Sequence, residues 1–142
     1  MKNVADNLKA SFACIKVSLD ADSIDLPKQN TRNFDKGAFF VQLSGKVNVP
    51  LVDMTLYADV ETGSSPEPIR ESIQLFNPDE GLYILEYKAE NLPEGKPLIG
   101  LLIGQAIGGA SIDVTCFHIT YDYHRNQEDL AGAIQIFNAW SE

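Results

Sequence analysis

The sequence has few of the residues that nucleic-acid binding requires. Its 142 residues include only 11 Lys and Arg against 20 Asp and Glu, and the formal net charge is −9. The basic residues are scattered singly along the chain. Because affinity for nucleic acids comes mostly from Lys and Arg that neutralise phosphates, we expect no nucleic-acid partner. An anionic membrane surface is disfavoured for the same reason.

Long apolar runs are absent as well. The longest, residues 97–110 (PLIGLLIGQAIGGA), is too short and too rich in glycine to span a bilayer. The N-terminus lacks the basic and apolar regions of a secretory signal peptide, so we expect synthesis in the cytoplasm with reduced thiols. The two cysteines, Cys14 and Cys116, lie in strand-like apolar settings that are typical of core residues. Their positions leave open whether they pair.

Motifs for catalysis and cofactor binding are missing too. No serine lies in a G-x-S-x-G sequence, and the glycines of residues 100–109 are not followed by the lysine of a phosphate-binding loop. The acidic stretch DADSID, with Asp20, Asp22 and Asp25, lacks the glycine and distal glutamate of an EF-hand loop. We interpret it as a solvated acidic loop. The sequence therefore predicts a protein that is not an enzyme and binds no cofactor.

What the sequence does have is alternation of apolar and polar residues, the pattern of strands with one face on a core and one in water. In the stretch AFFVQLSGKVNV, the apolar residues on one face are Phe39, Val41, Leu43, Val47 and Val49. Further strand candidates are residues 12–20, 51–60, 69–76, 82–88, 98–103 and 111–124. Residues expected to be buried are Val41, Leu43, Met54, Leu56, Ile84, Leu101, Val114 and Ile119.

Turn sequences divide these strands at short intervals. We interpret NPDEG (77–81) as a hairpin connection, and we expect the chain to bend at Pro50. Residues 21–37 form a long polar loop. The pattern predicts an all-β fold, an antiparallel, jelly-roll-like β-sandwich of about seven to eight strands. We expect a single domain over residues 1–142.

The two ends of the chain have a different pattern. Residues 1–11 place a few apolar side chains at helical spacing and predict an N-terminal arm or short helix. Residues 126–142 begin with Asn126, a suitable N-cap, and continue with an apolar stripe at helical spacing. We therefore expect a C-terminal helix there, with a last strand as the alternative.

The stretch CFHITYDYHR (116–125) holds both histidines of the chain. On a strand, His118, Asp122 and His124 point to one side, and these are ligand types of open metal sites. The aromatic and apolar residues Phe117, Ile119, Tyr121 and Tyr123 point to the other side. The spacing matches no specific metal motif. We therefore interpret the stretch as the end of a strand, with its aromatic face on the core and its histidine face in water.

With catalysis, nucleic acids and membranes disfavoured, we expect a structural or interaction subunit that assembles with itself, or with other structural proteins as well. Single-domain sandwiches of this kind resemble virion building blocks, such as phage capsid decoration or tail-associated proteins. A carbohydrate-binding module that uses exposed tyrosines is one alternative. A small metal-dependent, cupin-like enzyme that uses His118, Asp122 and His124 is the other.

Four apolar residues are candidates for contacts between copies. Phe40 lies on the strand face opposite Phe39, which gives this strand apolar surface on both sides. Leu8, Phe137 and Trp140 belong to the two ends of the chain, which need something to pack against because isolated short helices are marginal in water.

We therefore predict a homo-oligomer, a trimer or a ring, that weakens when residues 1–10 are deleted or when Trp140 is changed to Ala. Aromatic anchors of this kind tend to dominate contact energies, so the single substitution is expected to have a clear effect. Sedimentation of the intact and altered chains at micromolar concentration tests this. A wild-type monomer at that concentration would contradict the prediction.

Overall fold

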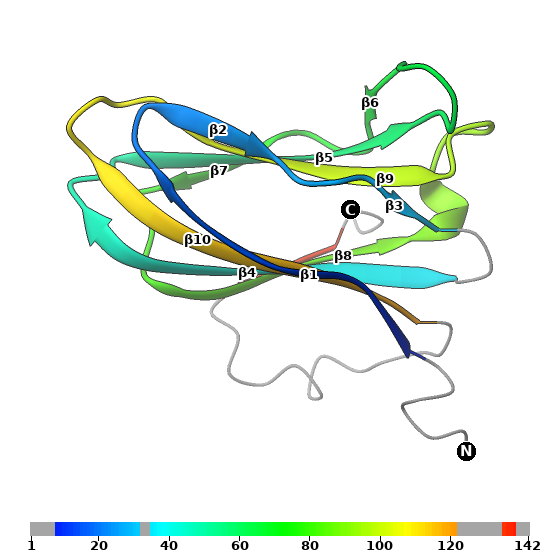
Figure 1. Cartoon of the computed structure of the whole chain (residues 1–142), viewed down its shortest axis with the longest axis horizontal. Helices are drawn as coiled ribbons and strands as arrows, with labels where there is room; N and C mark the ends of the chain where they lie inside the picture. Colours follow the sequence, from blue (N-terminus) through cyan, green and yellow to red (C-terminus); the bar gives the residue numbers. More distant parts are fainter. Residues whose placement is uncertain (1–7, 32–34, 122–134, 139–142) are drawn as a thin grey trace.

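The computed structural model describes residues 8–31, 35–121 and 135–138. These residues form two β-sheets packed face to face, seen as the lower and upper layers of Figure 1. The first sheet, sheet A, contains β1 (Leu8–Leu19), β4 (Lys36–Val47), β8 (Gly81–Lys88), β10 (Ser111–Tyr121) and β11 (Gln135–Asn138). The second, sheet B, contains β2 (Asp22–Asp25), β3 (Gln29–Asn30), β5 (Leu51–Asp59), β6 (Glu67–Pro68), β7 (Ile73–Phe76) and β9 (Leu98–Gln105). One 3₁₀ turn, η1 (Ala89–Asn91), links β8 to β9.

The strand order is that of a jelly roll. Sheet A runs β1-β10-β4-β8-β11, and sheet B runs β2-β9-β5-β6, with β3 beside β9 and β7 beside β5. Most connections between consecutive strands pass from one sheet to the other, as in a jelly roll. All pairs are antiparallel except that of β11, which runs parallel to β8 at the edge of sheet A. The all-β sandwich predicted from the alternation is therefore confirmed.

A single large cluster of apolar side chains fills the space between the sheets. All eight residues predicted to be buried are at most 6% exposed. Six of them belong to this cluster, whereas Ile84 and Ile119 form a second cluster with Ala38 on the outer face of sheet A. The alternation therefore identified buried positions correctly but did not separate the two faces of sheet A.

Two turn predictions have different outcomes. The chain does bend at Pro50, where it passes from β4 in sheet A to β5 in sheet B. Residues 77–81 are not a hairpin, because they join β7 in sheet B to β8 in sheet A. The residues of a turn do not decide where the chain goes next, because a tight turn can lead to a neighbouring strand or to the facing sheet.

Two strand predictions and one loop prediction need correction. Val47 is 50% exposed, because the pairing of β4 with β10 shifts between Ser111 and Asp113 and the bulge interrupts the alternation after Leu43. The predicted strand 69–76 is shorter in the structure, where β7 begins at Ile73. The polar loop predicted for residues 21–37 contains β2 and β3, both of which pair with β9.

The helical segments expected at the ends are wrong within the described residues. Residues 8–11 belong to β1, which pairs with β10. Residues 135–138 form β11, so the last-strand alternative holds there. Edge pairing satisfies the backbone N–H and C=O groups of these segments, which a short amphipathic helix would leave unmet at its ends. Residues 1–7, 126–134 and 139–142 lie outside the described parts of the chain.

Replacing Leu56 with Ala should destabilise the fold by about 2–5 kcal/mol, because the side chain is 1% exposed within the main cluster and its removal leaves a cavity. Urea unfolding of the two chains measures the difference. The matched control is Val47→Ala, which shortens an exposed apolar side chain and should change the stability by less than about 0.5 kcal/mol. A loss below about 1 kcal/mol for Leu56→Ala would contradict its position in the core.

Candidate functional site

The histidine of the stretch 116–121 lies between the sheets and not in water. His118 is 1% exposed, and its ring stacks on Tyr87 at 5.7 Å between ring centroids and contacts Phe39 at 4.6 Å. Its Nε2 shares a hydrogen bond of 2.5 Å with the Tyr87 hydroxyl. Burial lowers the pKa of His118 from 6.5 to about 3, so the ring is neutral at pH 7. The prediction that this strand face looks at water is therefore wrong.

The reason lies earlier on the same strand. Ile112, Val114 and Cys116 are all fully buried in the main cluster. Side chains two residues apart share a face, so His118 and Thr120 continue the inward face. Extending this alternation from residue 112 would have placed the histidine correctly. The aromatic side chain of Phe117 instead favoured the opposite face of the strand as the one that packs on the core.

The metal hypothesis gains no support from this arrangement. His118 points into the core, and Asp122 and His124 lie outside the described residues. Within residues 8–31, 35–121 and 135–138, no three His, Cys, Asp or Glu side chains lie close enough together to hold a metal ion. The carboxylates of DADSID also go to separate partners: Asp20 accepts from the Gly109 N–H and Asp25 from the Tyr57 hydroxyl.

The outer face of sheet A carries the second apolar cluster. Phe40 and Phe117 stack with their ring planes 2° apart and centroids at 4.8 Å, beside Leu82 and the buried Ile84. Phe40 therefore does point away from Phe39 and the core. Its role in contacts between copies stays a prediction.

Two of the other contact candidates lie in the edge strands of sheet A. Leu8 pairs with Tyr121 of β10, and Phe137 pairs with Leu85 of β8. Trp140 lies outside the described residues. Their part in self-association also stays a prediction.

Three exposed apolar side chains lie at the same end of the sandwich. Among the described side chains, the large apolar ones with high exposure are Val47 (50%), Phe76 (72%), Ile107 (48%) and Leu102 (39%). The first three end β4, end β7 and lie in the β9–β10 connection, which the strand pairing brings to the same end, at the left of Figure 1. We call this surface the apolar end.

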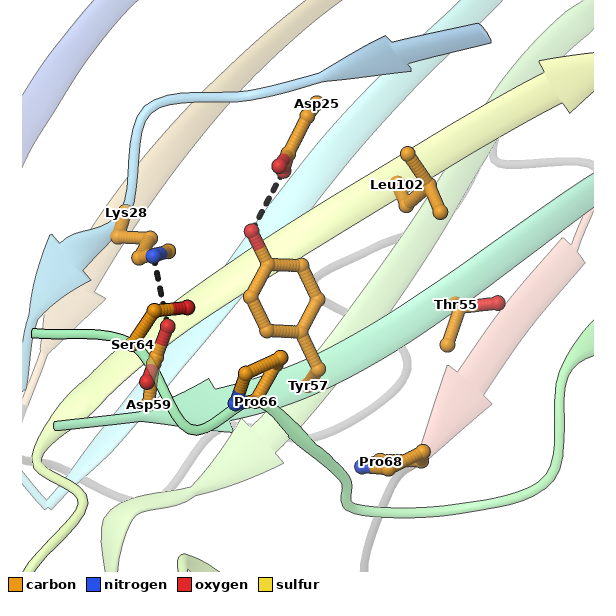
Figure 2. A pocket seen from close by; sticks show the side chains of 9 residues that line it. All are labelled: Asp25, Lys28, Thr55, Tyr57, Asp59, Ser64, Pro66, Pro68 and Leu102. Carbon is orange, nitrogen blue, oxygen red and sulfur yellow. Dashed lines mark hydrogen bonds and ion pairs between the residues drawn. The ribbon is translucent and has the colours of Figure 1, made fainter.

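The fourth, Leu102, lies in a pocket of about 380 Å³ on the outer face of sheet B, shown in Figure 2. We call it the sheet-B pocket. Its lining residues are Asp25, Lys28, Thr55, Tyr57, Asp59, Ser64, Pro66, Pro68 and Leu102. They come from β2, β5, β6, β9, the segment after β2, and the segment that joins β5 to β6. The sequence did not indicate this pocket, because its residues are brought together from across the sheet.

Strand register explains the floor of the sheet-B pocket. Asp25 on β2 and Thr55 on β5 are both paired with Leu102 on β9, so the three side chains form a row across the sheet. In the next row, Tyr57 is paired with Gly100. A Cβ at Gly100 would overlap the Tyr57 ring, so the glycine gives the ring room to lie across β9 and reach Asp25.

Two polar contacts hold the pocket in shape (Figure 2). The Tyr57 hydroxyl donates to Asp25 at 2.5 Å, and burial together with this carboxylate raises the pKa of Tyr57, so the phenol stays protonated. Lys28 and Asp59 form an ion pair at 2.6 Å. The fully buried Asp59 also accepts from the Ser65 and Val60 N–H groups, which fixes the segment after β5. The contacts from Lys28 and Ser65 hold the pKa of Asp59 at about 2.

No helix among the described residues has the length and hydropathy needed to cross a bilayer. No protein-family model matches the sequence, and no curated protein matches it. Among solved structures, the comparison finds a chain from Bacillus endospore appendages, which are described as a family of disulfide-linked pili. The identity is 13%, the TM-score is 0.48, and the match covers 83% of this chain and 90% of the other. A likeness of this size does not bear on function.

Lowering the pH should destabilise the fold through His118. Between its unfolded pKa of 6.5 and its folded pKa of about 3, the unfolded chain binds a proton that the folded chain does not. The contribution of the neutral ring is therefore complete above pH 6.5 and is lost as the pH falls toward 3. Each pH unit in this window corresponds to about 1.4 kcal/mol, so His118 alone should account for about 2 kcal/mol between pH 6.5 and about 5.

Urea unfolding at a series of pH values, with the wild type and His118→Gln compared, measures this contribution. Gln removes the titratable ring and keeps an amide that can bond the Tyr87 hydroxyl. Carboxylates titrate in both chains, so the readout is the difference between the two stability curves. Parallel curves from pH 7 to 4 would show that His118 has no depressed pKa.

Proposed function

We propose that this protein is a non-catalytic structural subunit that associates with copies of itself. The observation that carries the proposal is the apolar end, where Val47, Phe76 and Ile107 are each exposed at the same end of the sandwich. Single exposed apolar side chains are ordinary, but several at one place mark a contact surface. Phe76 is the strongest candidate for its centre because it is aromatic and 72% exposed.

The polar groups beside the apolar end are occupied within the chain. Glu80 accepts from the Gly45 N–H at 2.8 Å, and Lys46 donates to Asn77 at 2.7 Å. Asp20 accepts from the Gly109 N–H at 3.2 Å. Because these polar groups already have partners, a contact at this end would be stabilised mainly by burial of the apolar side chains.

A second copy is the partner we propose, and the charge of the chain sets the kind of contact. Two chains that each carry a net charge of −9 repel each other, so their association depends on apolar burial and not on ion pairs. Burying a Phe side chain is worth about 1.5–3 kcal/mol, which is enough to change a dissociation constant about tenfold or more. Salt screens the repulsion and should tighten such a contact.

The finer parts of the proposal concern the assembly. A trimer or ring that forms part of a virion, such as a capsid decoration or tail-associated protein, is the assembly we propose. Viral capsid proteins have the jelly-roll strand order, which they share with lectins and cupins. The cupin-like alternative stays a prediction to which the inward position of His118 gives no support.

Replacing Phe76 with Ser should weaken self-association about tenfold or more, because it removes the most exposed aromatic side chain of the apolar end. Sedimentation velocity over a micromolar concentration series, at low and high salt, measures the effect. The matched control is Leu102→Ser, which makes the same kind of change at an exposed apolar residue of the sheet-B pocket and should leave association unchanged.

Two results would overturn the proposal. One is a wild-type monomer throughout the series, and the other is equal weakening by Phe76→Ser and Leu102→Ser.

The contribution of the N-terminus is best tested by deleting residues 1–7. A deletion of residues 1–10 also removes Leu8–Ala10 of β1, which pair with β10, and would damage sheet A itself.

A further inference from the structure

We infer that the sheet-B pocket binds one neutral sugar ring, either a free monosaccharide or the terminal unit of a glycan. The inference does not depend on the proposed self-association, because the pocket and the apolar end are separate surfaces of the sandwich. It rests on the size of the pocket, the division of its lining into apolar and polar parts, its charge and the bonds that hold its shape.

The size suits a small ligand. The volume of about 380 Å³ is at the lower end of the range for small-molecule sites, which is roughly 300–1,000 Å³. The row formed by Asp25, Leu102 and Thr55 makes the floor, and the segment with Ser64, Pro66 and Pro68 makes one wall. A single six-membered sugar ring fits such a space.

The lining has an apolar part and a polar part. Pro66, Pro68 and Leu102 offer apolar surface, and Leu102 is 39% exposed although it lies on a sheet face. Asp25 and Lys28 lie across from the prolines in Figure 2 and offer an acceptor and a donor. A pyranose ring has the matching form, with C–H groups on its faces and hydroxyls around its edge that both donate and accept.

Charge excludes the other common ligands of such a pocket. The lining contains two carboxylates and one ammonium group, so an anion such as phosphate is repelled. A metal ion would find one carboxylate bonded to Tyr57 and the other buried against Lys28. A neutral ligand with hydroxyl groups is not repelled by the carboxylates and does not need to displace Tyr57 or Lys28 from them. It exchanges hydrogen bonds with water for hydrogen bonds with Asp25 and Lys28.

The pocket is held in shape before any ligand arrives. The Tyr57–Asp25 bond connects β5 to β2 across β9, and the Lys28–Asp59 pair connects the segment after β2 to the end of β5. Asp59 fixes the start of the wall through its bond to the Ser65 N–H. Groups that are already in place lose little conformational entropy when they bind, which favours binding even by a small ligand.

The test is saturation-transfer NMR on the full-length protein with methyl glycosides of glucose, galactose, mannose and N-acetylglucosamine. Ligand signals are observed, so the method works whether or not the chain assembles. Sorbitol, which has the hydroxyls without a ring, and inorganic phosphate are the negative probes. Oligosaccharides that end in the best monosaccharide then distinguish a free sugar from a glycan terminus, by whether added units strengthen or block binding.

Two variants test the site. Asp25→Asn keeps the shape and removes the charged acceptor, and Gly100→Ala displaces the Tyr57 ring that positions Asp25. The matched control is Asp22→Asn, an exposed carboxylate on the same strand that lies outside this pocket. We expect a dissociation constant of about 1 mM for the best glycoside, weakened about tenfold by each test variant and less than about twofold by the control.

Several outcomes would overturn the inference. They are the absence of binding by every glycoside up to about 50 mM, equal binding of sorbitol, tighter binding of phosphate, or equal effects of Asp25→Asn and Asp22→Asn. Unfolding temperatures of all variants show which of them remain folded. If Gly100→Ala does not fold, Asp25→Asn and its control still decide the question.

Discussion

Apolar side chains from sheet A and sheet B meet between the two layers, and this contact dictates which residues of every strand face inward. The alternation of a strand changes face only at a bulge. Because Ile112 and Val114 are buried, every second residue that follows them on the strand also faces the core. His118 is buried for this reason. Its neutral ring and its bond to Tyr87 are consequences of its place on the strand, and they make the fold sensitive to acid.

The two sheets use the same arrangement of a tyrosine beside a glycine on the neighbouring strand. In sheet A, Tyr87 is paired with Gly37, and the space left by the missing side chain lets the phenol reach His118 in the core. In sheet B, Tyr57 is paired with Gly100 and reaches Asp25 on the outer face. One arrangement therefore satisfies a buried polar group in the core and the other builds the floor of a pocket. A methyl group at either glycine would overlap the ring.

The two functions that we propose use different outer surfaces of the sandwich. The apolar end has exposed apolar side chains beside polar groups that are bonded within the chain, which suits contact with another protein surface. The sheet-B pocket combines apolar side chains with polar groups fixed in place, which suits a small polar ligand. A structural subunit can carry both, since they lie on different parts of the sandwich.

The sequence by itself determined the fold class and most buried positions, because alternation with a period of two is a local property that a reader can count. It also identified Phe40 as a residue that points away from the core, which the stacking on Phe117 bears out. It misplaced His118, the hairpin at residues 77–81 and the helical segments expected at residues 8–11 and 135–138. Which face of a strand is inward, and which sheet a turn leads to, depend on partners distant in the chain. Only the tertiary structure could bring Asp25, Tyr57 and Leu102 together, because their contact follows from the register of three strands that are not consecutive in the sequence.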